Sequence, residues 1–329
     1  MNKEALASYI DKFSQFKVLV VGDVVLDHYV FGKVERLNPE APVPILHAQH
    51  DKDMTGAAGN VAKNAAALGA KTTLIGVVGN DEAAKQIIDA AKVEGYELQA
   101  VVDHARPTIR KVRYLVGSQQ MLRVDFEETH DIEAAIEQKL IDHIQAAVEG
   151  VDAVLISDYA KGVITKNVAE AIVVAAKKRG IPVGADIKPS RAKFVKGIDF
   201  VSPNLKEGHE FLGLNPLEHG VKKPADIARA IYEKMNTNVF LTLSANGIYV
   251  VAADGSNEHV PVEHTPEVAD TSGAGDTAFT TIVLAQLAGA SPIEAAQLGN
   301  AAGSVVVGKV GSVGLTPQEL KNMVTHHHE

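Results

Sequence analysis

Short apolar segments that end in polar residues recur along the chain and indicate buried β-strands. The first, Lys17–Gly22 (KVLVVG), is an almost continuous apolar run, which is typical of a strand covered on both faces of a parallel sheet. Further strands are expected at 71–79, 98–102, 153–157, 181–185, 200–202 and 239–243. Helical patterns separate most of these segments, as crossover connections between parallel strands require. The pattern therefore predicts an α/β fold with a doubly wound, mostly parallel sheet and helices on both faces.

Helices are expected where apolar residues recur every three to four positions. The ranges are 56–68, 81–93, 132–147, 166–179, 225–235, 292–308 and 317–323. One more helix should begin just after Gly273 and end near Gly289. The segments 248–252 and 259–262 read as a β extension of the sheet.

Two segments, at about 24–48 and 109–126, have a different pattern that predicts a small β-sheet, here called the lid. The first alternates weakly, and three prolines exclude a helix there: Pro39, Pro42 and Pro44. The second contains two β-like runs joined through Gly117 and Ser118, which favours a hairpin. The stretch 51–55 is expected to be a polar connection. No linker or repeat is seen, so residues 1–329 are expected to form a single domain that carries the lid.

Composition narrows the classes of function. The net charge of −9 and the 5% content of aromatic residues argue against binding to nucleic acid. The absence of cysteine excludes disulfides, thiolate metal sites and cysteine nucleophiles. No apolar run reaches the ~18 residues of a membrane span, and the first residues lack the core of a signal peptide. We therefore expect a cytoplasmic protein without membrane contact, and we assign the histidines at 326–328 no metal role.

Candidate chemistry begins with the stretch 270–277, DTSGAGDT, just before an apolar helix. Its small residues Gly273, Ala274 and Gly275 leave backbone N–H groups exposed at the helix start, where an anion is favoured. Asp276 then acts either as a cap or as a base beside a bound phosphate. The chain lacks the P-loop, the GxGxxG fingerprint after its first strand, the HExxH zinc motif and the GxSxG elbow.

Other polar residues follow the predicted strands, at the sheet edge where open α/β folds bind ligands. They are Asp23, Asp27, Asp158, Lys161, Asn204, Ser244 and Gly247. A role as turn residues is the alternative. The lid hairpin carries Arg110, Lys111, Arg113, Gln120 and Arg123, which suit either a phosphorylated, polyhydroxylated ligand or a solvated face.

The chain resembles the ribokinase-like (PfkB) family of carbohydrate kinases over nearly its whole length. Residues 270–276 are similar to that family's carboxyl-terminal signature, and 56–62 with the following helix to its amino-terminal one. Four further segments are similar to the kinase domain of heptose-7-phosphate kinases, the kinase half of ADP-heptose synthases: 36–44, 106–113, 119–127 and 157–162. Ala57 departs from the pattern, since the family usually has a second glycine there.

This resemblance implies ATP-dependent phosphorylation of D-glycero-D-manno-heptose 7-phosphate at C1, in the synthesis of ADP-heptose for lipopolysaccharide. Asp276 would be the general base, in front of an anion hole formed by the N–H groups around Gly273, Ala274 and Gly275. The nucleotide would contact Asn204, Lys206, Glu207, Ser244, Gly247, Thr271, Asn300 and Ser304. The sugar would contact Asp23, Asp27, Gly56, Asn60, Gln120, Asp158 and Lys161, and its 7-phosphate Arg110, Lys111, Arg113 and Arg123.

The implied cofactors are ATP and Mg²⁺, with a monovalent cation left open. Family members often dimerise through the lid, so a homodimer is expected, with a small-molecule sugar phosphate as the substrate. Two alternatives on the same fold are another sugar kinase, similar to ribokinase or fructokinase, and a sugar-binding regulator without catalysis. A dinucleotide oxidoreductase is the weakest option, because only Gly22 follows the first strand.

Overall fold

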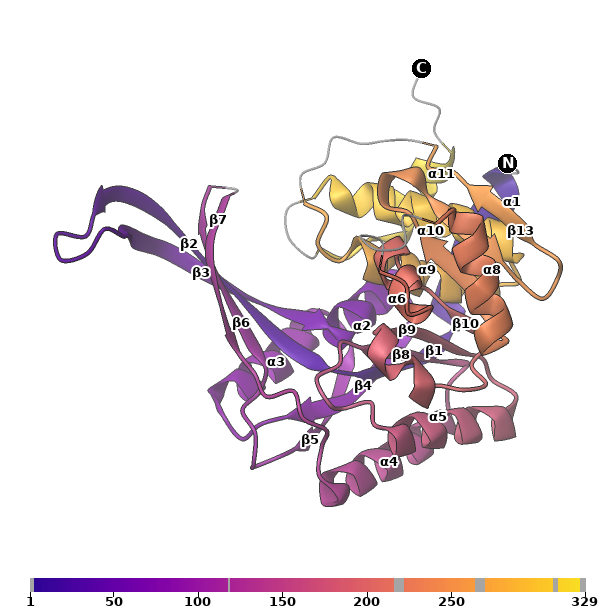
Figure 1. The fold of residues 1–329 in the computed structure, drawn as a ribbon, viewed down its shortest axis with the longest axis horizontal. Helices are drawn as coiled ribbons and strands as arrows, with labels where there is room; N and C mark the ends of the chain where they lie inside the picture. The colour runs from indigo at the N-terminus through magenta and orange to yellow at the C-terminus, as the bar shows by residue number, and fades with distance from the viewer. Residues whose placement is uncertain (1–2, 118, 216–221, 264–269, 310–312, 326–329) are drawn as a thin grey trace.

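The computed structural model describes residues 3–117, 119–215, 222–263, 270–309 and 313–325, and a large mixed sheet forms their centre (Figure 1). In these residues the strand order is β13-β12-β11-β10-β9-β8-β1-β4-β5. The parallel strands are β1 (Lys17–Gly22), β4 (Lys71–Val78), β5 (Glu97–Val102), β8 (Ala153–Asp158), β9 (Val183–Ile187), β10 (Phe200–Val201) and β11 (Asn238–Thr242). The antiparallel edge strands are β12 (Ile248–Val251) and β13 (Asn257–Val260). The predicted parallel sheet and its β extension are confirmed.

Helices cover both faces of this sheet, as predicted. One face packs against α1 (Lys3–Ile10), α2 (Ala58–Ala67), α3 (Glu82–Val93), α9 (Ala274–Leu287), α10 (Pro292–Val307) and α11 (Pro317–Thr325). The other packs against α4 (Ala134–Val148), α5 (Lys166–Arg179), α6 (Leu205–Phe211) and α8 (Pro224–Met235). Short 3₁₀ turns are η1 (Phe13–Gln15), η2 (Pro189–Phe194) and η3 (Ser244–Asn246). Strand β1 shows why its sequence is apolar throughout: Val18 and Val20 enter one core, and Leu19 and Val21 the other.

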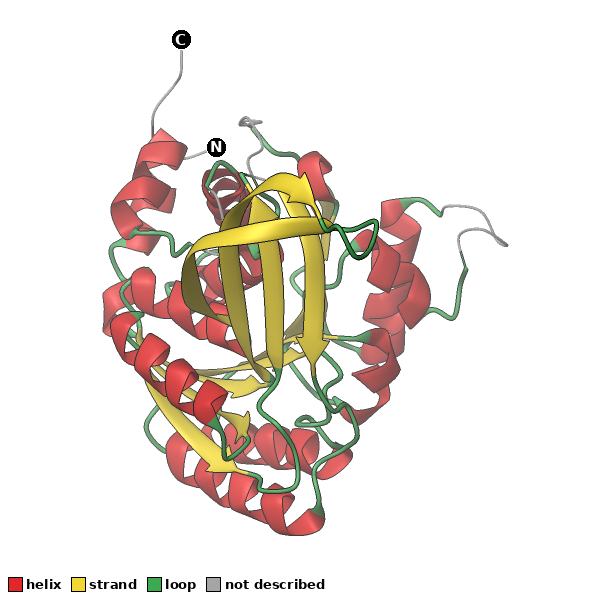
Figure 2. Ribbon diagram, turned by 90° about the vertical axis from the view of Figure 1, so that its left-hand side faces the viewer, coloured by secondary structure: helices red, strands yellow, loops and turns green. Residues whose placement is uncertain are grey.

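A second sheet projects from the body and lies in front of it in Figure 2. This small sheet has the order β3-β2-β6-β7 and consists of β2 (Val24–Leu37), β3 (Pro44–Ala57), β6 (Arg110–Val116) and β7 (Gln119–Phe126). Strands β2 and β6 run parallel, whereas the pairs β2–β3 and β6–β7 are antiparallel. Only Asp23 separates β1 from β2, so the chain passes directly from the large sheet into the small one.

The expectation of a polar connection at 51–55 was wrong, because these residues lie within β3. They pair with β2, and the His28 ring nitrogen lies 2.7 Å from an Asp53 carboxylate oxygen. The middle of β3, residues 47–52, is exposed, so Asp51 and Lys52 mark a strand that stands in solvent rather than a loop, whereas Met54 and Thr55 are buried. The strand continues to Ala57, and the following helix accordingly begins at Ala58 rather than Gly56.

No helix among the described residues is long and apolar enough to cross a membrane.

Candidate active site

The start of α9 lies at the centre of the candidate active site. Gly273, the residue before the helix, has a φ of 77°, a left-handed conformation that glycine adopts without strain. A Cβ atom on Gly275 would meet nothing within 4 Å, so the space over the first turn is open. Ala274 begins the helix, and its first N–H groups and positive dipole end therefore face this space.

Asp276, in the first turn of α9, is 6% exposed and is held by side chains from two other segments. Asn60 Nδ2 donates to one carboxylate oxygen at 2.7 Å, and the Tyr159 hydroxyl donates to the other at 3.0 Å. Burial raises the pKa of Asp276 above its ordinary value, whereas these two hydrogen bonds and the charges of Lys63 and Lys188 act in the opposite direction. The buried amide oxygen of Asn60 accepts no hydrogen bond from any described residue, so a bound hydroxyl group can donate to it.

A cavity of about 150 Å³ lies in front of Asp276, at the carboxyl edge of the large sheet. Its lining consists of Tyr159, Asp186, Lys188, Ser202, Asn204, Glu207, Thr242, Gly273, Gly275 and Asp276. Burial, together with repulsion from Asp276 and Glu207, raises the pKa of Asp186 to about 8. Among the described residues of this lining, Lys188 is the single cation. A polyanionic ligand therefore needs additional positive charge, such as a divalent cation, to enter.

Asn204 and Glu207 form a capping box at the start of α6. The Asn204 side chain accepts the Glu207 N–H at 2.9 Å, and one Glu207 carboxylate oxygen accepts the Asn204 N–H at 3.0 Å. The other oxygen of Glu207 lies 2.5 Å from Lys188 Nζ. Lys206 points elsewhere, since its side chain is 84% exposed and its Nζ lies 3.8 Å from Glu210.

A second cavity, of about 70 Å³, is lined by two of the predicted nucleotide residues, Asn300 and Ser304. Its lining includes Val260, Pro261, Glu263, Gln297, Asn300, Ala301, Ser304, Met323 and Val324. Asn300 Nδ2 donates to the Val260 carbonyl at 2.9 Å. Gly247, which ends the η3 turn that begins at Ser244, approaches the same carbonyl so closely that a Cβ would lie 2.2 Å from its oxygen. Thr271 is exposed and lies outside both cavity linings.

Asp23 is completely buried and acts as a clamp for a neighbouring loop. Its carboxylate accepts the backbone N–H groups of Tyr159, Lys161 and Val163. Asp158, also buried, accepts the Ala160 N–H, and burial with repulsion from Asp23 raises the pKa of Asp158 to about 7. The carboxylate of Asp23 is thus already engaged in fixing the 158–163 loop, while one oxygen of Asp158 has no partner among the described residues.

Asp27 lies at the root of the small sheet and forms an ion pair with Arg113. Gly56, which pairs with Val25 on the neighbouring strand, makes room for this carboxylate, because a Cβ there would lie 2.3 Å from an Asp27 oxygen. The pairing register places further polar residues on the same face: Lys111, Arg113, Arg123 and Asp125. Lys161, from the neighbouring loop, pairs with Glu127 at 2.6 Å.

Not all of the cations predicted to bind the phosphate lie on the face of the small sheet that carries Asp27. Arg110 lies on the opposite face, where its guanidinium stacks on the Phe126 ring at 4.5 Å. Arg123 forms an ion pair with Asp125 at 2.9 Å, and burial lowers the pKa of Lys111. Gln120 is exposed opposite Leu115. The structure therefore groups Lys111, Arg113 and Arg123 and separates Arg110 from them.

Comparison with known proteins assigns the family. Residues 15–319 match the profile described as pfkB family carbohydrate kinase. The chain belongs to the PfkB family. It is therefore a carbohydrate kinase, as the start of α9 and the sheet-edge cavity suggest.

Curated PfkB relatives of this chain include two proteins named bifunctional protein HldE. The one from Caulobacter vibrioides is 41% identical over 320 residues, which cover 96% of this chain and 65% of the relative. The one from Azorhizobium caulinodans is 42% identical over 310 residues, with 92% and 63% covered. The chain thus spans slightly less than two thirds of the length of these relatives.

Solved PfkB-type structures confirm the ribokinase-like fold. The tetrameric inhibited form of phosphofructokinase-2 from Escherichia coli superimposes with a TM-score of 0.76 at 19% identity, covering 94% of this chain and 98% of that one. Arabidopsis thaliana ribokinase complexed with ribose and ATP gives 0.72 at 23% identity, with 95% and 99% covered.

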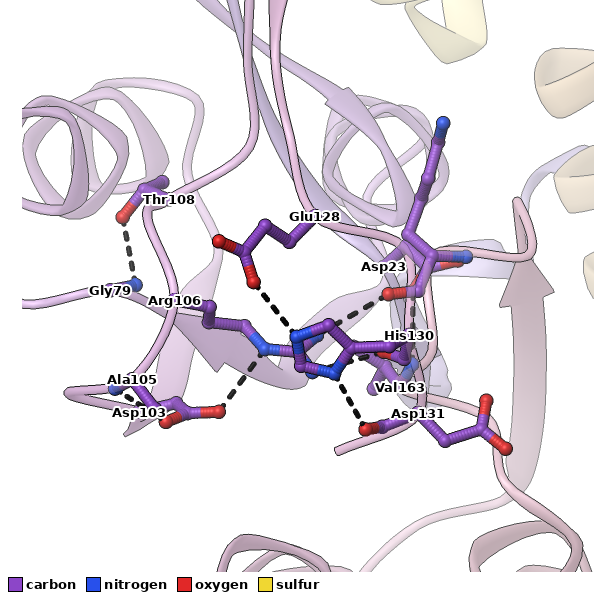
Figure 3. Close-up of polar contacts among 11 residues, drawn as sticks. Asp23, Gly79, Asp103, Ala105, Arg106, Thr108, Glu128, His130, Asp131 and Val163 are labelled. Carbon is purple, nitrogen blue, oxygen red and sulfur yellow. Dashed lines mark hydrogen bonds and ion pairs between the residues drawn. The ribbon is translucent and has the colours of Figure 1, made fainter. Parts of the chain in front are cut away.

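Tyr159, Asp186 and Lys188 are among the residues of this PfkB site that the sequence analysis did not assign to it. All three lie at or just after the carboxyl ends of β8 and β9, so the strand-end rule could have identified them. A fourth, Arg106, could not be found this way. Figure 3 shows its guanidinium between Asp103, at 3.1 Å, and the carbonyl of His130, at 3.0 Å. Arg106 lies in the segment that precedes β6, and its contact with His130 connects this segment to the one that follows β7. It also approaches the 158–163 loop, whose backbone N–H groups bind Asp23.

Proposed function

We propose that this PfkB-family kinase transfers the γ-phosphoryl group of ATP to the C1 hydroxyl of D-glycero-D-manno-heptose 7-phosphate. The product is the 1,7-bisphosphate, on the route to the ADP-heptose of lipopolysaccharide. The observation that carries the proposal is Asp276, a buried carboxylate held between Asn60 and Tyr159 at the open start of α9. The choice of acceptor rests on the four heptose-kinase-like segments and on the HldE relatives.

In the reaction Asp276 accepts the proton of the C1 hydroxyl as that oxygen attacks the γ-phosphorus. The new C1–O–P bond forms, the bond between the γ-phosphorus and the bridging oxygen breaks, and ADP leaves with that electron pair. The N–H groups at the start of α9, around Gly273, Ala274 and Gly275, face the oxygens of the transferring group. Asn60 positions the carboxylate with its amide nitrogen and offers its amide oxygen to the sugar.

The nucleotide fits between the two cavities. We infer that its base lies in the cavity of Asn300 and Ser304 and its phosphates over α9, with Ser244 and Gly247 between them. Oxygen ligands suit Mg²⁺, and the carboxylates of Asp186 and Glu207 line the phosphate cavity. We infer that phosphate oxygens and water would supply most of the ligands of Mg²⁺. When bound, Mg²⁺ neutralises phosphate charge. Because ATP is the donor, we expect the reaction in the cytoplasm.

The 7-phosphate is assigned to the cationic face of the small sheet. Lys111 and Arg123 are the leading candidates, because Arg110 lies on the other face and Arg113 pairs with Asp27 in a largely buried contact, whereas the Arg123 side chain is 48% exposed. The sugar itself lies between Asp27, Asn60 and the 158–163 loop. A phosphate bound at this face would replace Asp125 as the ionic partner of Arg123.

The test is an ADP-release assay with heptose 7-phosphate, ribose, fructose and fructose 6-phosphate, with ³¹P NMR of the product. We expect the highest kcat/KM with heptose 7-phosphate and a new phosphate ester at C1. Asp276→Asn should lower kcat by ~10²–10⁴-fold while sugar binding survives. Higher kcat/KM with an unphosphorylated sugar would identify a different acceptor, and sugar binding without ADP release would identify a regulator.

A further inference from the structure

Lys188 lies beside Asp276 but has no role in the base mechanism proposed for that residue. It follows β9, and Pro189 starts the η2 turn directly after it, so its backbone is fixed on both sides. Its side chain is 37% exposed and enters the cavity in front of Asp276. As the single cation among the described residues of this lining, it faces three carboxylates, those of Asp186, Glu207 and Asp276.

Two contacts define the present position of the ammonium group. Lys188 Nζ lies 2.5 Å from a Glu207 carboxylate oxygen and 5.0 Å from the centre of the Tyr159 ring. Burial by itself would lower the pKa of Lys188, but the hydrogen bond and charge of Glu207, with the charges of Asp186 and Asp276, raise it above the ordinary value. Lys188 is thus a protonated counter-ion of an acidic cavity.

We propose that Lys188 is a catalytic residue that leaves Glu207 when the nucleotide binds and donates hydrogen bonds to the transferred phosphoryl group. This inference rests on the proposed use of ATP but not on the identity of the sugar. Two changes would drive the exchange. Mg²⁺ bound with the nucleotide would supply positive charge near Glu207 and Asp186, and the γ-phosphate oxygens would offer the ammonium group a stronger anion.

Lys188 keeps its proton throughout the step. The acceptor proton passes to Asp276, the O–P bond to the sugar forms, and the bond to the ADP oxygen breaks. Lys188 stabilises the phosphoryl oxygens from the side of β9, whereas the N–H groups of α9 approach from the helix start. Other nearby cations already have acidic neighbours away from this cavity: Lys63 lies 4.0 Å from Glu94, and Arg191 lies 2.6 Å from Asp131.

The test compares Lys188→Met and Lys188→Arg with Lys193→Met, an exposed lysine in the following turn that lies outside the cavity lining. We expect Lys188→Met to lower kcat by ~10²–10³-fold, the cost of losing one group that stabilises transition-state charge. The KM for the sugar should stay within about threefold, because the proposed contact of Lys188 is to the transferred phosphoryl group and not to the sugar. Lys188→Arg should recover part of kcat, and Lys193→Met should match the wild type.

Calorimetry adds a readout that does not depend on turnover. With Mg²⁺ and sugar present, Lys188→Met should bind the ground-state analogue AMP-PNP within about tenfold of the wild type, but should lose more affinity for ADP with aluminium fluoride, which mimics the transferring group. Circular dichroism checks that each variant is folded. If Lys188→Met does not fold, the same measurements are made on Lys188→Gln.

Two results would overturn the role of Lys188. One is a kcat of Lys188→Met within about threefold of the wild type. The other is an equal loss of affinity for both analogues, which would make Lys188 a ground-state contact only. Failure of the proposed acceptor is a separate result: if the wild type phosphorylates another sugar, the same variants are compared with that sugar.

Discussion

The hydroxyl of Tyr159 donates to Asp276, the proposed general base, at 3.0 Å and stabilises the charged form of this carboxylate. In Tyr159→Phe this donor is lost, so the pKa of Asp276, already raised by burial, should rise further. A general base works only when ionised, so activity is lost as the pH falls through the pKa. The acidic limb of the kcat/KM profile for the sugar should therefore move to higher pH.

Profiles of kcat/KM from pH 5 to 9 measure this shift. Tyr9→Phe is the matched control, because its hydroxyl also approaches a carboxylate, that of Glu294, but on α1 and α10 and outside both cavity linings. It should leave the profile unchanged. If the acidic limb of the profile does not move in Tyr159→Phe, the Tyr159 hydroxyl does not lower the pKa of Asp276.

Ala57 carries backbone strain at the junction of β3 and α2. Its φ of 52° and ψ of −123° are disfavoured for a residue with a Cβ atom and are readily adopted by glycine. Ala57→Gly should therefore raise the free energy of unfolding by about 1 kcal/mol, measured by urea denaturation. Ala58→Gly, in the first turn of α2, should instead lower it by about 0.5–1 kcal/mol. A lower free energy of unfolding in Ala57→Gly would show that the backbone at Ala57 is not strained.

At the scale of elements, Arg106 joins the two connections of the small sheet to the body (Figure 3). Its side chain and that of Asp103 are both about 5% exposed or less, and their ion pair has a separation of 3.1 Å. Arg106→Met would leave Asp103 as an unpaired buried charge, so the free energy of unfolding should fall by about 3–5 kcal/mol. The sugar KM should also rise, because Arg106 approaches the Lys161 carbonyl in the sugar-side loop.

Urea denaturation and sugar titrations measure the two effects. The exposed pair of Arg179 and Glu149, 2.6 Å apart, provides the comparison, and Arg179→Met should cost less than about 1 kcal/mol. The double variant Arg106→Met with Asp103→Leu should recover part of the lost stability, because it removes the unpaired charge. Equal losses in Arg106→Met and Arg179→Met would show that Arg106 does not hold the small sheet.

The central strands of the large sheet could be predicted because they are mostly apolar, as β1 and β8 are, and the start of α9 because its glycines and Asp276 are adjacent in the sequence. Contacts between residues that lie far apart in the sequence could not be predicted in this way. The three N–H groups that Asp23 accepts lie at least 136 residues further along the chain, and nothing in the local sequence separates this clamp from a ligand contact. The register that places Arg123 opposite Arg113, on the face of Lys111, is likewise a property of paired strands.

At the scale of the whole molecule, the projecting small sheet leaves large apolar side chains in solvent. Leu37 is 67% exposed, Leu122 56% and Phe126 44%. Side chains of this size on a sheet that stands away from the body indicate a surface for another chain. A second copy fits the expected dimerisation through the lid, and such a contact needs about 1,000 Å² or more of buried surface.

We therefore expect a homodimer by light scattering and a monomer for the double variant Leu122→Lys with Phe126→Lys. Both side chains are exposed, so the charges should break the contact without unfolding the chain. Val174→Lys, at a residue 61% exposed on α5, adds a charge elsewhere on the body and should stay dimeric. If the double variant remains a dimer while the wild type is one, the interface lies outside this face of the small sheet. If the wild type is a monomer at micromolar concentration, the exposed residues have another partner or none, and the sugar site must be complete within a single chain.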